Sequence, residues 1–311
     1  MSYLERALEL AERGRGTTHP NPVVGAVVVT PGGAVVGEGW HERAGEPHAE
    51  LVALRAAGGR AAGATLYATL EPCSRFGRTP PCVDAIVGAG IAKVVVGSDD
   101  PSQEGVERLR ELGVEVELVD SWEARRQNEA WRTWKLLGRP FVTYKAAVTL
   151  DSRVTIPDSR WISGEESRRL VHTLRAQSDV VAVGMGTVRA DDPRLDARDV
   201  AAERQPRRLA FGLGPLPDGS ELELRSGEPV EELRALAGEG VQSLLLEGGP
   251  TIATAFLERG LIDKLLLFVA PKLSGEGPHL FNDFTGMREL TRTSVRQVGE
   301  DVLVEGYLRE T

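Results

Sequence analysis

The residues best suited to chemistry occur in three short segments of the first hundred positions. The triplet His-Ala-Glu at 48–50 is followed by Cys73 and then Cys82, and each cysteine comes directly after a proline. Zinc prefers imidazole and thiolate ligands, and the chain has no other cysteine. Three protein ligands leave a fourth position open, which a catalytic zinc uses to bind and acidify water. We therefore expect His48, Cys73 and Cys82 to hold a catalytic zinc ion.

The position of Glu50 indicates a role in proton transfer. Residues two apart do not share a helix face, so His48 and Glu50 can serve one ion only at a helix N-terminus. Glu50 would then carry protons there, and Cys82, at a second predicted helix start, would be favoured as thiolate. H-x-E followed by P-C is typical of zinc deaminases of nucleobases, in which water displaces an exocyclic amine and the carboxylate moves the proton.

Three classes of function remain open on these residues. The first is a small-molecule deaminase, and the second is a polynucleotide-editing zinc deaminase with a C-terminal recognition domain. The third is a non-catalytic zinc module, whose closed site would need a fourth ligand from elsewhere. A disulfide between Cys73 and Cys82 is a further alternative, although nothing else in the sequence indicates an oxidising compartment.

The length of 311 residues and the sequence pattern predict two α/β domains. A hairpin over 23–40, a helix over 47–58 and strands over 64–70 and 93–97 predict a mixed sheet covered on both faces. One helix is expected over 122–137, with Trp122, Trp131 and Trp134 as a packing face against the other domain. A Gly-Arg-Pro stop then places the boundary between domains 1–138 and 139–311. The second domain is expected to have a mostly parallel sheet with an antiparallel end.

Composition favours a small substrate. The net charge is −9, from 37 basic and 46 acidic residues, which disfavours nucleic-acid binding. No stretch approaches about 18 uninterrupted apolar residues, and the first 25 residues lack a signal-peptide pattern, so we expect no membrane span.

The second half contains two glycine-bearing strand ends, at 184–187 and 248–251. Their backbone N–H groups could approach phosphates, which predicts a dinucleotide lying across the carboxyl edge of the sheet. The first is not a full G-x-G-x-x-G, because Arg189 stands where the third glycine would be, so ordinary tight turns remain the alternative.

Several longer motifs resemble the bifunctional riboflavin-biosynthesis deaminase/reductases. They are THPNPVVGAVVV (18–29), GEGWHERAGEPHAE (37–50), TLEPCSRFGRTPPC (69–82), KAAVTLDSR (145–153), GTVRADDPRL (186–195), LLLEGGPTIA (244–253) and FVAPKL (268–273). The resemblance implies a cytidine-deaminase-like three-layer α/β/α domain followed by a dihydrofolate-reductase-like α/β domain. It implies deamination of 2,5-diamino-6-(5-phosphoribosylamino)pyrimidin-4-one and then NADPH-dependent reduction of the ribose to a ribityl chain, in the cytoplasm and as a homo-oligomer.

The resemblance also implies roles for individual residues. His48, Cys73 and Cys82 would ligate zinc, Glu50 would move the proton, and Asn21 would hold the pyrimidine, with His19 and His41 as further candidates. NADPH contacts would come from Ala147, Trp161, Thr187, Asp191, Gly249, Pro250, Thr251, Ile252, Ala253, Thr254 and Ala255. Substrate contacts in the second domain would come from Ser159, Arg175, Leu195, Arg198 and Glu247. Asp191 is the candidate proton donor. Gly212-Leu213 stands where the family tends to have an Asp-Ser pair.

Overall fold

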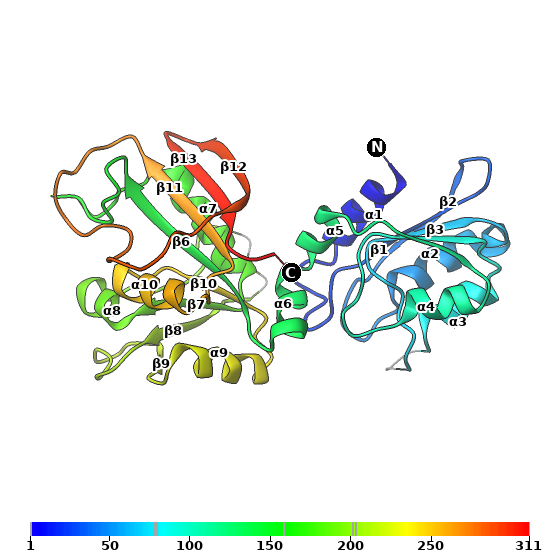
Figure 1. The fold of residues 1–311 in the computed structure, drawn as a ribbon, viewed down its shortest axis with the longest axis horizontal. Coiled ribbons are helices and arrows are strands. Elements are labelled where there is room, and N and C mark those ends of the chain that lie inside the picture. The colour runs from blue at the N-terminus through cyan, green and yellow to red at the C-terminus, as the bar shows by residue number, and fades with distance from the viewer. Residues whose placement is uncertain (1, 77–79, 158, 201, 203, 311) are drawn as a thin grey trace. The chain divides into compact units, whose positions relative to one another are not determined.

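The chain forms two compact units, Met1–Leu136 and Leu137–Glu310, shown from blue to green and from green to red in Figure 1. This computed structural model describes residues 2–76, 80–157, 159–200, 202 and 204–310. Residues 77–79, within the motif between the two cysteines, lie outside the described residues.

The first unit contains a five-stranded mixed sheet of order β2-β1-β3-β4-β5. Strands β1 and β2 form the expected antiparallel hairpin, whereas β3, β4 and β5 run parallel to one another. The elements are α1 (Tyr3–Glu12), β1 (Gly25–Val29), β2 (Val35–Trp40), α2 (Ala49–Ala57), the 3-10 helix η1 (Gly58–Ala61), β3 (Thr65–Ala68), α3 (Cys82–Gly88), β4 (Lys93–Val96), α4 (Gly105–Glu111), β5 (Glu115–Leu118), α5 (Trp122–Gln127) and α6 (Glu129–Leu137).

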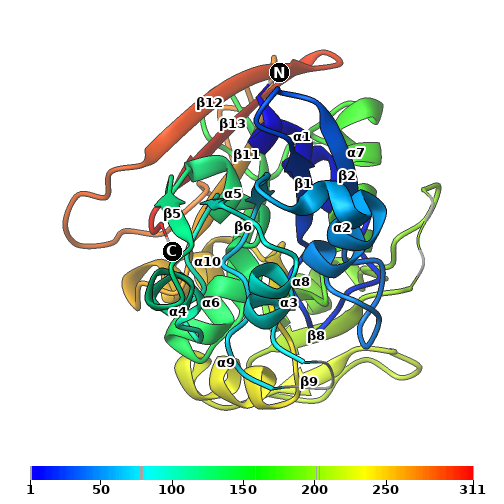
Figure 2. The same ribbon diagram turned by 90° about the vertical axis from the view of Figure 1, so that its right-hand side faces the viewer.

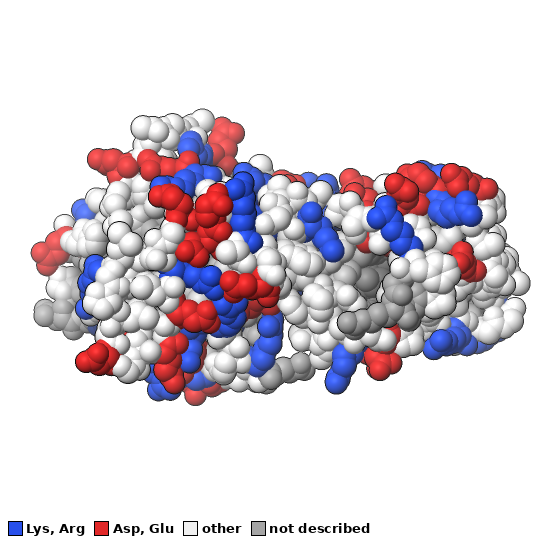
Figure 3. Space-filling view, turned by 90° about the horizontal axis from the view of Figure 1, so that it is seen from below, with Lys and Arg blue, Asp and Glu red and all other residues white. Residues whose placement is uncertain are grey.

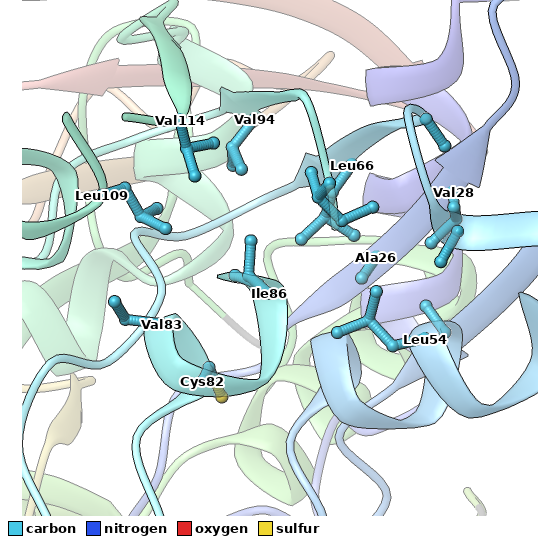
Figure 4. Close-up of a cluster of buried hydrophobic side chains, with 14 of the residues drawn as sticks. Ala26, Val28, Leu54, Leu66, Cys82, Val83, Ile86, Val94, Leu109 and Val114 are labelled. Atoms are coloured by element: carbon cyan, nitrogen blue, oxygen red, sulfur yellow. The ribbon is translucent and has the colours of Figure 1, made fainter. Parts of the chain in front are cut away.

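Helices cover both faces of this sheet, which confirms the expected three layers. Helices α2, α3 and α4 lie next to one another on one face (Figures 1 and 2). Their apolar side chains pack on the sheet around Leu66 and Ile86, in a cluster that includes Cys82 (Figure 4). On the other face, Ala7 and Leu10 of α1 pack on Val27 and Val29. The zinc ligands expected on α2 and α3 therefore belong to helices fixed by the core.

Helix α2 lies unusually close to β2 because two glycines face it. A Cβ atom added at Gly39 would come within 2.5 Å of the Ala49 carbonyl oxygen, and one added at Gly37 would collide with the Ala53 carbonyl oxygen. Only hydrogen atoms fit between helix and strand at these positions. The spacing fixes the first turn of α2, which carries Glu50.

The single helix expected over 122–137 is wrong, because the chain forms α5 and α6 with a break at Asn128. The side chain of Asn128 accepts a hydrogen bond from the Val23 backbone N–H (2.9 Å) and donates one to its carbonyl (2.9 Å). Asparagine side chains compete in this way with helical backbone bonding. At this break, the two hydrogen bonds of Asn128 connect the start of α6 to the loop before β1.

The second unit contains an eight-stranded sheet of order β12-β13-β11-β6-β10-β7-β8-β9. Strands β11, β6, β10, β7, β8 and β9 are parallel, and β13 and β12 form the expected antiparallel end. The elements are β6 (Phe141–Thr149), α7 (Glu165–Gln177), β7 (Val180–Gly184), α8 (Met185–Asp191), β8 (Arg207–Phe211), β9 (Glu223–Arg225), α9 (Pro229–Gly238), β10 (Ser243–Leu246), α10 (Pro250–Glu258), β11 (Lys264–Ala270), β12 (Thr291–Val298) and β13 (Asp301–Tyr307).

Two hydrophobic layers enclose the second sheet. Helices α9 and α10 pack on one face through Leu233, Leu236 and Phe256, and α7 and α8 pack on the other through Val171 and Val188. The central parallel strands β7 and β10 are buried on both faces, so their sequences are almost continuously apolar rather than alternating. The expected α/β class of the second domain is therefore confirmed.

Candidate functional site

Two helix N-termini and one loop present the predicted zinc ligands. His48 is the N-cap residue of α2, and Glu50 lies in the first turn of that helix. Cys82 is the first residue of α3, and Cys73 lies in the loop that follows β3. The N-terminus of a helix favours negative charge, because its first N–H groups have no partner within the helix.

The three side chains converge on one point. Their ligand atoms all lie within 4.8 Å of one another. His48 Nδ1 is 3.2 Å from Cys82 Sγ and 3.5 Å from Cys73 Sγ. Tetrahedral zinc with ordinary bond lengths places a nitrogen and a sulfur ligand about 3.5 Å apart. The donor set and its spacing fit zinc, and both cysteines are free rather than joined in a disulfide.

The electrostatics of this cluster favour a thiolate at Cys73. Hydrogen bonds from the Cys82 thiol, from His48 and from the Cys82 backbone N–H lower the pKa of Cys73. The hydrogen bond with Cys73 in turn raises the pKa of His48. Burial raises the pKa of Glu50, whose side chain also contacts Cys82. A carboxyl group beside the ligand cluster and shielded from water is suited to hold and release a proton.

His41 holds Asn21 at the edge of the same site. The ring of His41 contacts the Pro47 carbonyl through Nδ1 (3.2 Å) and the Asn21 side-chain nitrogen through Nε2 (3.1 Å). Because Nδ1 must donate to the carbonyl, a neutral ring has Nε2 free to accept from the amide. Burial lowers the pKa of His41, which agrees with this neutral form. His41 therefore contacts Asn21 only through the amide nitrogen and makes no hydrogen bond to the amide oxygen.

A cavity of about 260 Å³ joins these groups. Its lining includes Asn21, His41, His48, Glu50 and Cys73. The other lining residues are Pro20, Pro22, Val24, Leu70, Glu71, Asp100, Ser102, Gln103, Trp131, Trp134 and Lys135. His19, the other histidine candidate, is exposed and not among them.

The cavity wall includes residues that the sequence analysis placed elsewhere or missed. Trp131 and Trp134, which the sequence analysis selected only as a packing face against the other domain, both line this cavity of the first unit. Their spacing of three residues does place them on one side of α6. Lys135 and Asp100 carried no signal in the sequence, because only the path of the chain brings them to the metal ligands.

In the second unit, the structure brings together the predicted Arg175 and Glu247. Arg175 Nε is 2.6 Å and its Nη2 3.0 Å from the two carboxylate oxygens, in a bidentate pair. Lys145, which the sequence analysis did not select, lies 3.5 Å from the same carboxylate. Burial by itself would raise the pKa of Glu247, but Lys145 and Arg175 lower it overall. Arg198 approaches this cluster through Asp196, with which it forms an ion pair of 2.6 Å.

The two glycine-bearing strand ends also meet. The Gly249 N–H donates a hydrogen bond to Thr187 Oγ1 (3.3 Å), which joins the start of α10 to the first turn of α8. Within 249–255, Thr251 is exposed at the helix start, whereas Ala253 and Thr254 face the core. The predicted contacts of this stretch would therefore come from its first residues.

The remaining predicted residues are more scattered. Ser159 Oγ accepts a hydrogen bond from the backbone N–H of Trp161 (3.2 Å), and the Trp161 side chain is 47% exposed. Asp191 is exposed at the end of α8, and Ala147 lies on β6. Leu195 is buried in the core, so it could meet a ligand only through its backbone.

Comparison with known proteins covers both units. Residues 1–98 match the model of the cytidine and deoxycytidylate deaminase zinc-binding region, and residues 140–212 and 220–304 match the RibD C-terminal domain. The riboflavin biosynthesis protein RibD of Aquifex aeolicus is 41% identical over 97% of each chain. The RibD of Escherichia coli is 38% identical over 96% of this chain and 97% of that protein.

Solved structures agree over the same length. A RibD structure from Acinetobacter baumannii superposes with a TM-score of 0.85 at 35% identity, covering 98% of this chain and 97% of that chain. A diaminohydroxyphosphoribosylaminopyrimidine deaminase/5-amino-6-(5-phosphoribosylamino)uracil reductase from Thermotoga maritima gives 0.84 at 33% identity, with the same coverage. With both domains and the whole length matched, this chain belongs to the RibD family of riboflavin biosynthesis proteins, bifunctional enzymes that combine a deaminase with a reductase.

Proposed function

We propose that residues 1–138 deaminate 2,5-diamino-6-(5-phosphoribosylamino)pyrimidin-4-one and that residues 139–311 reduce the ribose of the product with NADPH. The observation that carries the first half is the convergence of His48, Cys73 and Cys82 beside the buried Glu50, in a cavity large enough for a pyrimidine. His48, Cys73 and Cys82 would hold zinc. Zinc bound there would acidify a water molecule and so supply a nucleophile near neutral pH.

The protein side chains divide the remaining work of deamination. Glu50 takes a proton as water adds to the carbon that bears the amine and gives it to the nitrogen as ammonia leaves, so water is consumed and the C–N bond becomes C=O. Asn21, held by His41, orients the pyrimidine through the free oxygen of its amide. The wall formed by Trp131 and Trp134 excludes bulk water and offers flat apolar surfaces to the ring.

In the reductase half, the charged cluster supports binding of a phosphorylated sugar. Arg175, Arg198, Glu247, Ser159 and the backbone of Leu195 would contact the substrate. NADPH would lie along the strand ends, with contacts from Ala147, Trp161, Thr187 and the stretch 249–255. Asp191 would donate the proton that accompanies hydride transfer.

We expect a small phosphorylated pyrimidine and no nucleic acid as the partner, and a homo-oligomer in the cytoplasm. The net charge of −9 supports a small substrate, and on the face shown in Figure 3 acidic and basic side chains alternate without a broad basic field. None of the helices among the described residues is long and apolar enough to cross a membrane. A polynucleotide-editing enzyme would need a basic track for the phosphate backbone.

The test supplies the diaminopyrimidine phosphate with and without NADPH. Wild-type protein should release ammonia without NADPH and oxidise NADPH only after deamination. Glu50→Gln should lose deamination by roughly 10²- to 10⁴-fold while retaining one zinc ion per chain. Glu111→Gln, an exposed position on α4, is the matched control and should change neither quantity. Full deamination by Glu50→Gln would refute the role of Glu50. If the wild type released ammonia but oxidised no NADPH when NADPH was supplied, the reductase assignment would be refuted.

A further inference from the structure

The deaminase cavity carries acidic side chains but has to admit a substrate that bears a phosphate. Glu50, Glu71 and Asp100 all line it. A phosphate dianion is repelled by whichever of these carboxyl groups is ionised, unless a cation compensates for the charge. Among the described lining residues, the single lysine or arginine is Lys135.

Helix α6 holds Lys135 at this position by two anchors. At its start, the Asn128 side chain bonds both backbone groups of Val23, in the loop that also contributes Asn21 and Val24 to the cavity. One turn later, the buried Arg132 forms an ion pair of 2.9 Å with Asp99, beside the lining residue Asp100. The stretch of α6 that carries Lys135 is therefore anchored to both of these segments of the cavity wall.

The ammonium group of Lys135 is available to a ligand. It lies 4.5 Å from the centre of the Trp134 ring, and its charge also acts on the carboxylate of Asp100 in the cavity wall. The residue is exposed to solvent. An aromatic face orients an ammonium group without neutralising its charge, so the group can still attract an anion.

We propose that Lys135 binds the phosphate of the deaminase substrate at the mouth of the cavity and makes the deaminase selective for the phosphorylated compound. This inference rests on the proposed function. The ring and the amine need to reach Glu50 and the zinc ligands inside the cavity, which leaves the sugar phosphate on the solvent side. The exposed ammonium of Lys135 lies on that side of the wall. It supplies a positive charge that offsets the acidic lining residues and attracts the phosphate.

The test compares kcat/KM for the diaminopyrimidine ribosyl phosphate and for the same compound without its phosphate, measured as ammonia release. Lys135→Met should lower kcat/KM for the phosphorylated compound by about tenfold, mainly through KM, because an exposed charged hydrogen bond has a modest value. The dephosphorylated compound should react equally well with both proteins. Lys135→Arg should restore most of the preference, and the preference of the wild type should weaken at higher salt.

Two controls make the result decisive. Lys93→Met removes a lysine of β4 that pairs with Glu115 and Glu117, and it should leave the preference unchanged. The double variant Arg75→Met/Arg78→Met removes both arginines of the loop between the cysteines, which are the competing cations, and it should also leave the preference unchanged. The proposal is overturned if Lys135→Met affects both compounds equally or neither, or if the double variant abolishes the preference while Lys135→Met does not. If the wild type releases no ammonia from either compound, the proposed function itself fails.

Discussion

Replacing Asn128 with alanine should destabilise the first unit and disturb its cavity together. Asn128 and Val23 are 5% and 6% exposed, and two side-chain hydrogen bonds of 2.9 Å join them. Alanine leaves the Val23 N–H and carbonyl buried without these partners, and each unsatisfied group costs about 1–3 kcal/mol. We expect the free energy of unfolding to fall by about 2–4 kcal/mol, because partial access of water offsets part of the loss.

Tryptophan fluorescence makes this measurable in the whole chain. Trp40, Trp122, Trp131 and Trp134 lie in the first unit, and Trp161 lies in the second. In a Trp161→Phe background the signal therefore reports the first unit, and with a urea slope of about 2 kcal/mol per molar the midpoint should fall by about 1–2 M.

The matched control is Asn282→Ala, which changes an exposed asparagine of the second unit and should leave the midpoint unchanged. Deamination by Asn128→Ala should weaken at temperatures where the first unit remains folded, because α6 then holds Trp131 and Lys135 less firmly. A midpoint shift below about 0.2 M would refute the role given to the Asn128 bonds.

Three further predictions follow from the two units. Cys82→Ser should lower zinc content and deamination together but leave NADPH oxidation with supplied deaminated substrate intact. Asp263→Ala should destabilise the second unit by about 3–5 kcal/mol, because it leaves the buried Arg139 guanidinium, now 2.7 Å from the Asp263 carboxylate, without this partner. The measurement is the part of the fluorescence unfolding signal that disappears in the Trp161→Phe background. Glu247 has a lowered pKa, so its stabilising effect is complete above its unfolded value of about 4.3 and is lost as pH falls through the folded value. In Glu247→Gln, the free energy of unfolding should fall less steeply as the pH is lowered. If its slope against pH between pH 3 and 5 equalled that of the wild type, the pairing would be contradicted.

The fold and the metal cluster could be predicted because their signals are local. Apolar runs and helix stops predicted the hairpin, the two sheets and the antiparallel end, and the residue types His48, Cys73 and Cys82 predicted the zinc set. Asn128 was missed because a polar residue within a helical pattern does not reveal whether it faces solvent or clamps another segment.

The missed charged residues depend on long-range pairing. Lys145 appeared as one polar residue in an apolar strand, and only the parallel pairing of β10 with β6, Leu246 opposite Tyr144, carries Glu247 next to it. Lys135 likewise reaches the cavity only because α6 is anchored to the loop containing Val23 and to Asp99. The spacing of residues along the chain reveals neither the proximity of Lys145 to Glu247 nor that of Lys135 to the cavity.

The glycines of β2 make the metal chemistry depend on positions that contribute no side chain to it. Gly37 and Gly39 let α2 rest against the strand, and that helix begins with His48 and Glu50. A methyl group at either position would displace α2 from the strand. This displacement would increase the distance between the His48 imidazole and the two cysteine sulfurs. Substitutions on a neighbouring strand that provides no ligand should thus weaken zinc binding through displacement of this one helix.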